Sequence, residues 1–178
     1  MGQIEPDRFV FLDESNAKTT MTRRHGRAPR GERVVDHVPA GEYHSTTILG
    51  ALRHDGTIAA MVYEGGTNVS VMQSFAEGQL QTILRPQDIV VMDNLAAHKD
   101  RGVTAAIEAA GARVCFLPPY SPDLNPIEKM WSKVKAILRT AKARTADALL
   151  DAIGVALRAV TFNDAEGWFA HCGYGNTE

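Results

Sequence analysis

The chain has 178 residues, 44% of them apolar, and a formal net charge of −2. This length allows one buried core, so we expect a single domain over residues 1–178. The charge excludes a protein that coats nucleic acid through net charge alone, and no apolar run approaches the roughly 20 residues that a membrane-spanning helix needs.

The first predicted strand covers residues 8–13, where consecutive apolar positions indicate burial on both faces. We expect this strand to end at Asp13. Residues 14–43 are polar, basic and rich in Gly and Pro. This composition predicts an excursion that lies over a surface, with one brief strand near residues 32–37.

Strands and helices alternate in the rest of the chain. Residues 45–52 and 57–63 predict two strands joined through an Asp-Gly pair, which is typical of a hairpin. Apolar residues at helical spacing then run from Asn68 to Leu84. Further predicted elements are a strand at 88–93, a helix at 100–110, a strand at 113–117, a helix from Asn125 to about residue 138 and a helix at 145–160. The residues after 160 show no clear pattern.

This order of elements predicts an α/β fold. The first three strands are expected to be antiparallel, and the later strands are joined through helices, which requires a mixed five-stranded sheet with helices on both faces. The ribonuclease-H-like three-layer fold has this order of elements.

Three carboxylates occur where predicted strands end or a helix begins. Asp13 and Asp93 each close a strand, and Glu128 is the third residue of a helix that Asn125 and Pro126 begin. Ligands bind at the carboxyl ends of strands in such sheets, so the three side chains can meet at one edge. Carboxylates without His or Cys partners suit Mg²⁺ or Mn²⁺, and two such ions would activate a water and stabilise the leaving oxygen of a phosphodiester.

Each carboxylate also has a structural interpretation. Asp13 and Asp93 are common types of residue at the turn after a strand, and Glu128 suits the positive end of a helix dipole. Competing acids are also present. They are Glu14, Glu64 and Asp123. Glu14 would face away from Asp13 if the strand continued.

Two basic runs stand out against the mildly acidic whole. Six Lys and Arg residues and a single acid lie between Lys18 and Arg33, and six more without any acid lie between Lys129 and Arg144. Local basic surface is compatible with phosphate contacts, although either run alone is equally compatible with a solvated face.

Specific strings in the chain resemble a known family. The strings VVMDNLAAHK and LPPYSPDLNPIEKMWSKVK, with 34 residues between Asp93 and Glu128, are similar to the catalytic domain of DDE transposases. FLDES around Asp13 resembles the first acidic motif of that family, and RRHGRAPRGER its basic segment. Within the family, the chain is similar to the bacterial insertion-sequence transposases related to the mariner elements.

The resemblance implies a function and a set of residues. It implies metal-dependent cleavage of DNA at transposon ends and transfer of the freed strand into target DNA, with Asp13, Asp93 and Glu128 as the ligands of Mg²⁺ or its substitute Mn²⁺. It also implies a homodimer that acts on DNA in the bacterial cytoplasm. Supporting positions are Asn94, His98, which is expected to position a phosphate or the third carboxylate, and Asn125, which is expected to cap the helix of Glu128. The expected phosphate contacts are Arg23, Arg24, Arg27, Arg30, Lys133, Lys135 and Arg139.

The chain departs from the family at its N-terminus. Only twelve residues precede Asp13, which leaves no room for the helix-turn-helix DNA-binding domains of the family. We therefore expect that region to be absent, or to come from an upstream reading frame. Two other functions remain open, namely a catalytically silent remnant or accessory DNA-binding subunit, and another nuclease of the same fold such as a ribonuclease H or resolvase.

Overall fold

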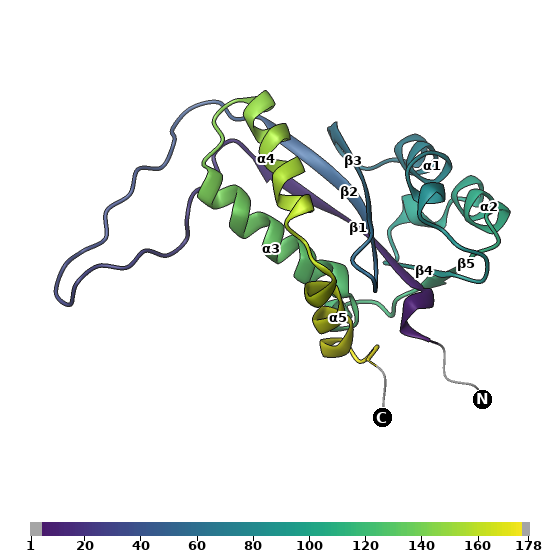
Figure 1. The fold of residues 1–178 in the computed structure, drawn as a ribbon. Helices are drawn as coiled ribbons and strands as arrows, with labels where there is room; N and C mark the ends of the chain where they lie inside the picture. The colour runs from purple at the N-terminus through teal and green to yellow at the C-terminus, as the bar shows by residue number, and fades with distance from the viewer. Residues whose placement is uncertain (1–4, 176–178) are drawn as a thin grey trace.

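The computed structural model describes residues 5–175 and contains a five-stranded sheet of order β3-β2-β1-β4-β5 (Figure 1). The first three strands are antiparallel neighbours, whereas β4 runs parallel to β1 and β5 runs parallel to β4. The predicted mixed five-stranded sheet is therefore confirmed. The strands are β1 (Phe9–Lys18), β2 (Ser45–Arg53), β3 (Ile58–Glu64), β4 (Ile89–Met92) and β5 (Arg113–Phe116).

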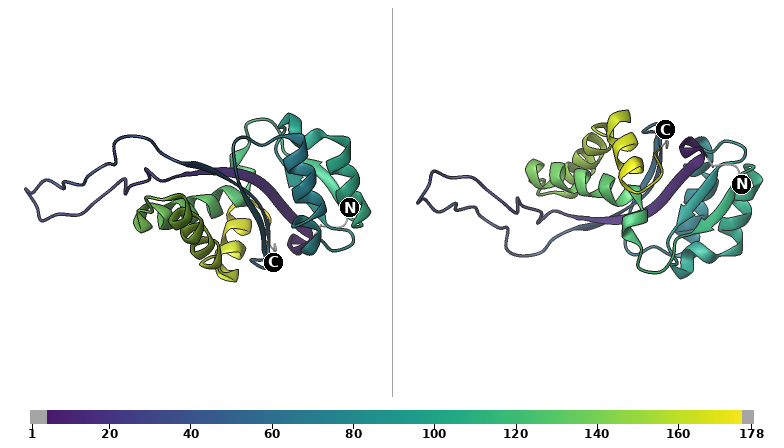
Figure 2. Two further views of the ribbon diagram at one scale, coloured as in Figure 1. Left: turned by 90° about the horizontal axis from the view of Figure 1, so that it is seen from above. Right: turned by 90° about the horizontal axis from the view of Figure 1, so that it is seen from below.

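Helices cover both faces of the sheet, as Figure 2 shows from two sides. One face packs against α1 (Val69–Glu77) and α2 (Arg101–Ala109), and the other against α3 (Pro126–Ala141), α4 (Ala146–Arg158) and α5 (Phe162–His171). The sheet thus separates two apolar cores. Within residues 5–175, no helix is both long and apolar enough to cross a membrane.

Strand β1 is longer than predicted. It continues to Lys18, because its pairing with β2 runs without a break from Val10 opposite Arg53 to Lys18 opposite Ser45. The prediction that the strand ends at Asp13 is therefore wrong. The apolar run does end there, but beyond it buried and exposed residues alternate, which is the pattern of a strand that has one face in solvent.

Three helical features also differ from the prediction. The helix expected as far as Leu84 ends at Glu77, and a 3₁₀ turn at Leu80–Thr82 carries the later apolar contacts. Helix α3 continues to Ala141 rather than to residue 138. Helix α5 was not predicted, although Thr161 and Asp164 form a capping box that marks its start in the sequence.

The segment between β1 and β2, residues 19–44, forms an extended arm that projects from the body of the molecule (Figure 1). It contains no strand, so the brief strand near 32–37 is absent from it, and residues 23–38 are exposed rather than laid over a surface. The segment has no apolar periodicity and therefore no face to bury. Its base is anchored to the end of α3, where the Arg144 guanidinium donates to the carbonyl oxygen of Thr19 at 2.7 Å.

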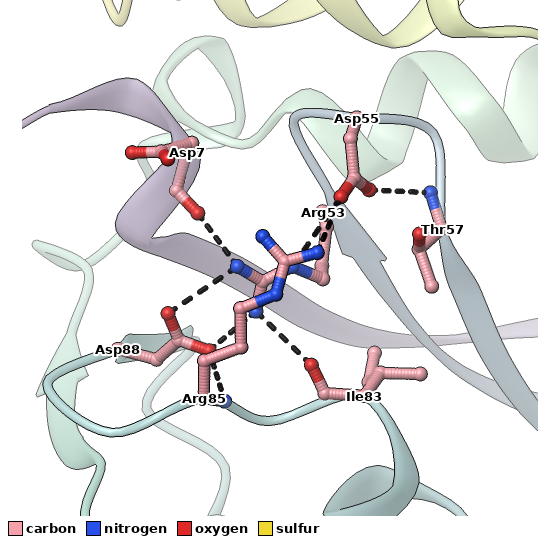
Figure 3. Close-up of polar contacts among 7 residues, drawn as sticks. All are labelled: Asp7, Arg53, Asp55, Thr57, Ile83, Arg85 and Asp88. Atoms are coloured by element: carbon pink, nitrogen blue, oxygen red, sulfur yellow. Dashed lines mark hydrogen bonds and ion pairs between the residues drawn. The ribbon is translucent and has the colours of Figure 1, made fainter.

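A buried ion pair joins the hairpin to the parallel half of the sheet (Figure 3). Arg53, the last residue of β2, is 1% exposed, and its guanidinium binds Asp88 just before β4. The same guanidinium donates to the carbonyl oxygens of Asp7 and Ile83 at 2.7 and 3.1 Å. A buried charge of this kind needs such partners, since an unpaired one would be strongly destabilising.

Trp131 fixes the position of α3 on the sheet. Its ring is 2% exposed and lies against Gly50 of β2, where an added Cβ would be only 2.8 Å from Cη2. Gly50 is the β2 residue opposite Asp13. The contact therefore sets α3 over the part of β1 that carries Asp13, and Trp131 is a packing residue.

We expect Gly50→Ala to lower stability by about 1–3 kcal/mol, because the new methyl group would overlap the Trp131 ring. Thermal unfolding followed by circular dichroism measures the change. Gly167→Ala in α5 is the matched control, since a Cβ there meets nothing within 4 Å and Ala favours a helix. A Gly50→Ala protein as stable as the control would contradict the close contact.

Candidate active site: an acidic pocket between the sheet and helix α3

A pocket of about 550 Å³ brings together residues from four parts of the chain. Asp13 comes from the middle of β1, Asp93 and Asn94 follow β4, and Asn125 and Glu128 begin α3. The opposite wall is the loop of residues 117–122, which joins β5 to α3. The three predicted carboxylates therefore line one pocket, whereas Glu14, Glu64 and Asp123 are not among its lining residues.

Asp13 is the buried member of this set, with 8% of its surface exposed. Burial, and then the negative charge of Glu128, raise the pKa of Asp13 from 3.8 to about 7; Glu14 and Asp93 add smaller contributions in the same direction, and a backbone hydrogen bond opposes them. The ionised form of Asp13 therefore lowers the free energy of unfolding when no cation is present. A cation between these acids would remove that cost.

Asp93 directly follows β4 and turns the chain. Its Oδ1 atom accepts a hydrogen bond of 2.9 Å from the backbone N–H of Leu95, which is the turn role that its sequence position allows. The same oxygen lies 2.6 Å from Nδ1 of His98. Next to it, the Asn94 amide donates to the carbonyl oxygen of Leu117 at 2.5 Å and so ties the end of β4 to the residue after β5.

His98 is fully buried between two acids. Its Nε2 atom lies 3.3 Å from Oε2 of Glu14, on the side opposite its contact with Asp93. Burial lowers the pKa of His98, but Glu14 and then Asp93 outweigh burial and leave this pKa above its usual value. In the structure His98 therefore contacts the second carboxylate, rather than the third carboxylate that was one of its expected partners.

Glu128 occupies the third position of α3, and its backbone N–H donates to the carbonyl oxygen of Asn125 at 3.1 Å. Asn125 is the N-cap residue of α3, as predicted, but its side chain forms no capping hydrogen bond. Pro126 begins the helix, where a backbone N–H would have no partner within the helix. The Asn125 side chain is 5% exposed beside the pocket, and its Oδ1 has no hydrogen-bond partner among residues 5–175.

The donor set fits a divalent cation. Three carboxylates offer the oxygen ligands that Mg²⁺ and Mn²⁺ prefer, and the raised pKa of Asp13 shows that they lack a compensating charge of their own. Among residues 5–175, no three such side chains are close enough together to hold an ion as they stand. Binding would therefore draw the carboxylates together.

Two of the predicted phosphate contacts come together although they belong to different basic runs. Burial and the nearby charge of Arg24, in the arm, lower the pKa of Arg139, in α3. In the arm itself, residues 22–27 and 34–38 face each other across a pocket of about 530 Å³, which includes Arg23 and Arg27. Arg30 is exposed and Lys135 is half-buried.

Lys133 differs from these residues because its ammonium group lies 2.5 Å from Asp164 of α5. This ion pair joins α3 to the unpredicted helix. Lys133 therefore stabilises the packing of α3 on α5, and Asp164 compensates its charge.

The contact of Glu14 with His98 was not foreseen. Strand alternation predicts that Glu14 faces away from Asp13, but the partner on that far side depends on the path of residues 94–100. No spacing in the sequence indicates that a histidine returns there.

The comparisons with known proteins identify one family by sequence and one fold by structure. Residues 8–150 match the sequence model of a family described as DDE superfamily endonuclease. No curated protein sequence matches the chain. Its structure is similar to the Mos1 transposase paired-end complex with left transposon end (16% identity, TM-score 0.73, 94% of this chain and 52% of that one). It is also similar to the Mos1 mariner paired-end complex with Mn (17% identity, TM-score 0.71, 94% of this chain and 53% of that one). A third similar structure is the catalytic domain of Mos1 mariner transposase (17% identity, TM-score 0.60, 97% of this chain and 85% of that one).

These similarities establish that the fold is the ribonuclease-H-like fold of transposase cores, as predicted. The chain spans about half the length of the transposase chains in the paired-end complexes.

We expect Asp13→Asn to raise the melting temperature of the metal-free protein by about 5 °C at pH 8, because the amide cannot carry the buried charge. The cost of that charge is absent below the ordinary pKa of 3.8 and is complete above about 7, so the gain should disappear towards pH 4. Thermal unfolding in EDTA across this pH range measures it. Asp151→Asn, on the exposed face of α4, should show no such trend, and an Asp13→Asn protein less stable than wild type at pH 8 would contradict the argument.

Proposed function

The chain belongs to the DDE superfamily of endonucleases, and from this premise we propose that it is a transposase catalytic domain, which cleaves DNA at transposon ends and transfers the freed strand into target DNA. The observation that carries the proposal is the acidic pocket, in which Asp13, Asp93 and Glu128 come from three separate elements. Stability alone would not favour three acids around one cavity, since burial and mutual repulsion raise the pKa of Asp13.

The same three side chains are the proposed ligands of Mg²⁺, or of Mn²⁺ in its place, with two ions in the active complex. The Mos1 paired-end complex is known with Mn and with Mg. When bound, such ions activate a water or hydroxyl for attack on a phosphodiester and stabilise the leaving oxygen. Asp13 would contribute its charge from the buried side of the pocket, and Glu128 from the start of α3, whose position Trp131 fixes.

DNA is the proposed substrate and principal partner. Arg24 and Arg139 combine the positive charge of the arm and of α3, and Arg23, Arg27, Arg30 and Lys135 extend it. Mos1 binds a transposon end in its paired-end complex. For this chain we also propose a homodimer that acts on DNA in the bacterial cytoplasm.

One observation favours a second function. Because no three acidic side chains in the described part of the chain are close enough together to hold an ion as they stand, a catalytically silent DNA-binding subunit of a split transposase is the alternative. Metal-dependent cleavage separates the two functions directly.

We expect the full chain to nick a supercoiled plasmid that carries the DNA flanking its coding sequence, only when Mg²⁺ or Mn²⁺ is present. Asp93→Asn and Glu128→Gln should each lower the nicking rate at least about 100-fold, because each removes a proposed ligand. Gel electrophoresis of the plasmid forms measures the rate.

Glu64→Gln is the matched control for these two variants, since Glu64 is exposed and is not one of the lining residues of the pocket. Equal nicking by wild type, Asp93→Asn and Glu128→Gln would overturn the ligand assignment. Binding of DNA without any nicking would favour the silent subunit.

We expect Arg139→Ala to weaken DNA binding and to reduce the slope of log Kd against log salt concentration by about 1, because one phosphate contact would be lost. Fluorescence anisotropy with a labelled duplex across 50–200 mM salt measures both quantities. Arg158→Ala, at the end of α4, removes the same charge elsewhere and should leave the slope unchanged. If both variants give the same slope of log Kd against log salt concentration, Arg139 does not contact a DNA phosphate.

A further inference from the structure

His98 lies at the centre of a chain of contacts behind the acidic pocket. Its two ring nitrogens lie close to different acids, with Nδ1 at 2.6 Å from Asp93 Oδ1 and Nε2 at 3.3 Å from Glu14 Oε2. The histidine is 0% exposed, so water does not compete for either contact. Asp93 is one of the proposed ligands, whereas Glu14 has no place in the function described so far.

Glu14 reaches His98 because it faces the other side of the sheet from Asp13. Val10 and Leu12 of β1 belong to the core under α1 and α2, whereas Phe11 belongs to the core under α3, α4 and α5. The alternation of side chains along a strand therefore places Asp13 on the α3 side and Glu14 on the α2 side. His98, in the 3₁₀ turn before α2, joins Glu14 to Asp93 around the end of β4.

The Asp93 carboxylate needs such support. Its side chain is 43% exposed, and the last torsion of an aspartate is broad, so an unsupported group would rotate in solvent. Oδ1 accepts a hydrogen bond from the Leu95 N–H and lies against Nδ1 of His98, while Oδ2 has no partner within residues 5–175. One oxygen is thereby fixed and the other is left for a ligand in the pocket.

We propose that Glu14 and His98 are positioning residues, which hold Asp93 through its Oδ1 atom and so set the affinity of the pocket for a divalent cation. The inference rests on the proposed function, because Asp93 must be a ligand for its orientation to matter. Partners of this kind behind a ligand typically change metal affinity by about 10–100-fold. A purely structural role, in which Glu14 only satisfies a buried histidine, would change stability without changing that affinity.

The test measures Mn²⁺ binding to the full chain by isothermal titration calorimetry, with the Mn²⁺-dependent rise in melting temperature as a second readout. We expect Glu14→Ala to weaken Mn²⁺ binding about tenfold. Glu14→Gln should recover most of the affinity, since its amide oxygen keeps an acceptor beside Nε2 of His98. Glu64→Ala removes the same charge from an exposed strand end and should bind as wild type does.

A double-mutant cycle separates positioning from simple charge attraction. If Glu14 acts through His98, Glu14→Ala should cost nothing further in a His98→Ala background. An undiminished effect of Glu14→Ala in that background would overturn the proposal, as would wild-type affinity in the Glu14→Ala protein. Wild-type protein that binds no Mn²⁺ would instead contradict the proposed function, and this inference with it. If Glu14→Ala fails to fold, Glu14→Leu, which keeps the volume of the side chain but offers no acceptor, takes its place in the cycle with His98→Ala.

A second and independent observation concerns Tyr120, at the rim of the same pocket. This side chain is fully exposed, and its φ of 56° lies in the left-handed region that non-glycine residues rarely adopt. It belongs to the loop of residues 117–122, in which three prolines restrict the backbone. A large aromatic side chain held in a strained conformation without any burial does not serve the stability of the fold.

We infer that the Tyr120 ring stacks on a DNA base next to the phosphate that reacts in the pocket. Exposed aromatic rings are the usual platforms for unpaired bases, and the position of Tyr120 at the rim would place such a base beside the three carboxylates. This inference also rests on the proposed function, because it takes the partner to be DNA.

Two substitutions of Tyr120 test the inference, one that removes the aromatic ring and one that keeps it. Tyr120→Asn should unfold at the same or a higher temperature, since Asn tolerates the left-handed region, but should bind a frayed-end duplex about tenfold more weakly. Tyr120→Phe keeps the ring and should bind as wild type does. Quenching of 2-aminopurine in the frayed strand measures the stacking directly. Equal binding and quenching by Tyr120→Asn and wild type would overturn the inference, whereas a wild-type chain that binds no DNA would contradict the proposed function itself.

Discussion

The contact of Trp131 with Gly50 is the constraint on which the candidate site depends. The ring fits against the sheet only because residue 50 has no Cβ, and Gly50 is the strand neighbour of Asp13. One packing contact therefore sets the distance between β1 and α3, and with it the position of Glu128, which begins the same helix one turn earlier. The lysine–aspartate pair between α3 and α5, and the anchoring of the arm beside the end of α3, act on the same helix from other directions. The functional elements are thus held by their packing on one another rather than by the carboxylates themselves.

The molecule contains two buried aspartates with opposite surroundings. Asp88 is paired with the guanidinium of Arg53, which also satisfies two backbone carbonyls, so its charge is compensated within the fold. Asp13 has no such partner, and burial together with the negative charges of Glu128, Glu14 and Asp93 raises its pKa to about 7. The first arrangement joins two halves of a sheet. The second leaves a site in which added positive charge is stabilising, and this is the physical basis for placing a divalent cation there.

Much of the fold was predictable because strong local signals marked it. The Asp-Gly hairpin, the apolar runs before Asp93 and around residue 115, and the Pro126 helix start all agree with the structure. Where the prediction failed, longer-range contacts decide. The pairing of β1 with β2 carries the strand past Asp13, and the Asn125 side chain lines the pocket instead of forming a capping hydrogen bond. The gathering of Asp13, Asp93 and Glu128 followed from strand ends and a helix start, even though Asp13 proved to be mid-strand. The contact between Glu14 and His98 could not be predicted, because it depends on how an irregular segment returns to the far face of β1.

The most direct test of the central claim, that the three carboxylates hold a divalent cation, is the position of that cation. Crystals of the full chain grown with Mn²⁺ would give anomalous difference peaks at the manganese absorption edge. We expect one or two peaks in the acidic pocket, within about 2.0–2.2 Å of oxygen atoms of Asp13, Asp93 and Glu128. A peak held by other residues, or a pocket without a peak in crystals saturated with Mn²⁺, would contradict it.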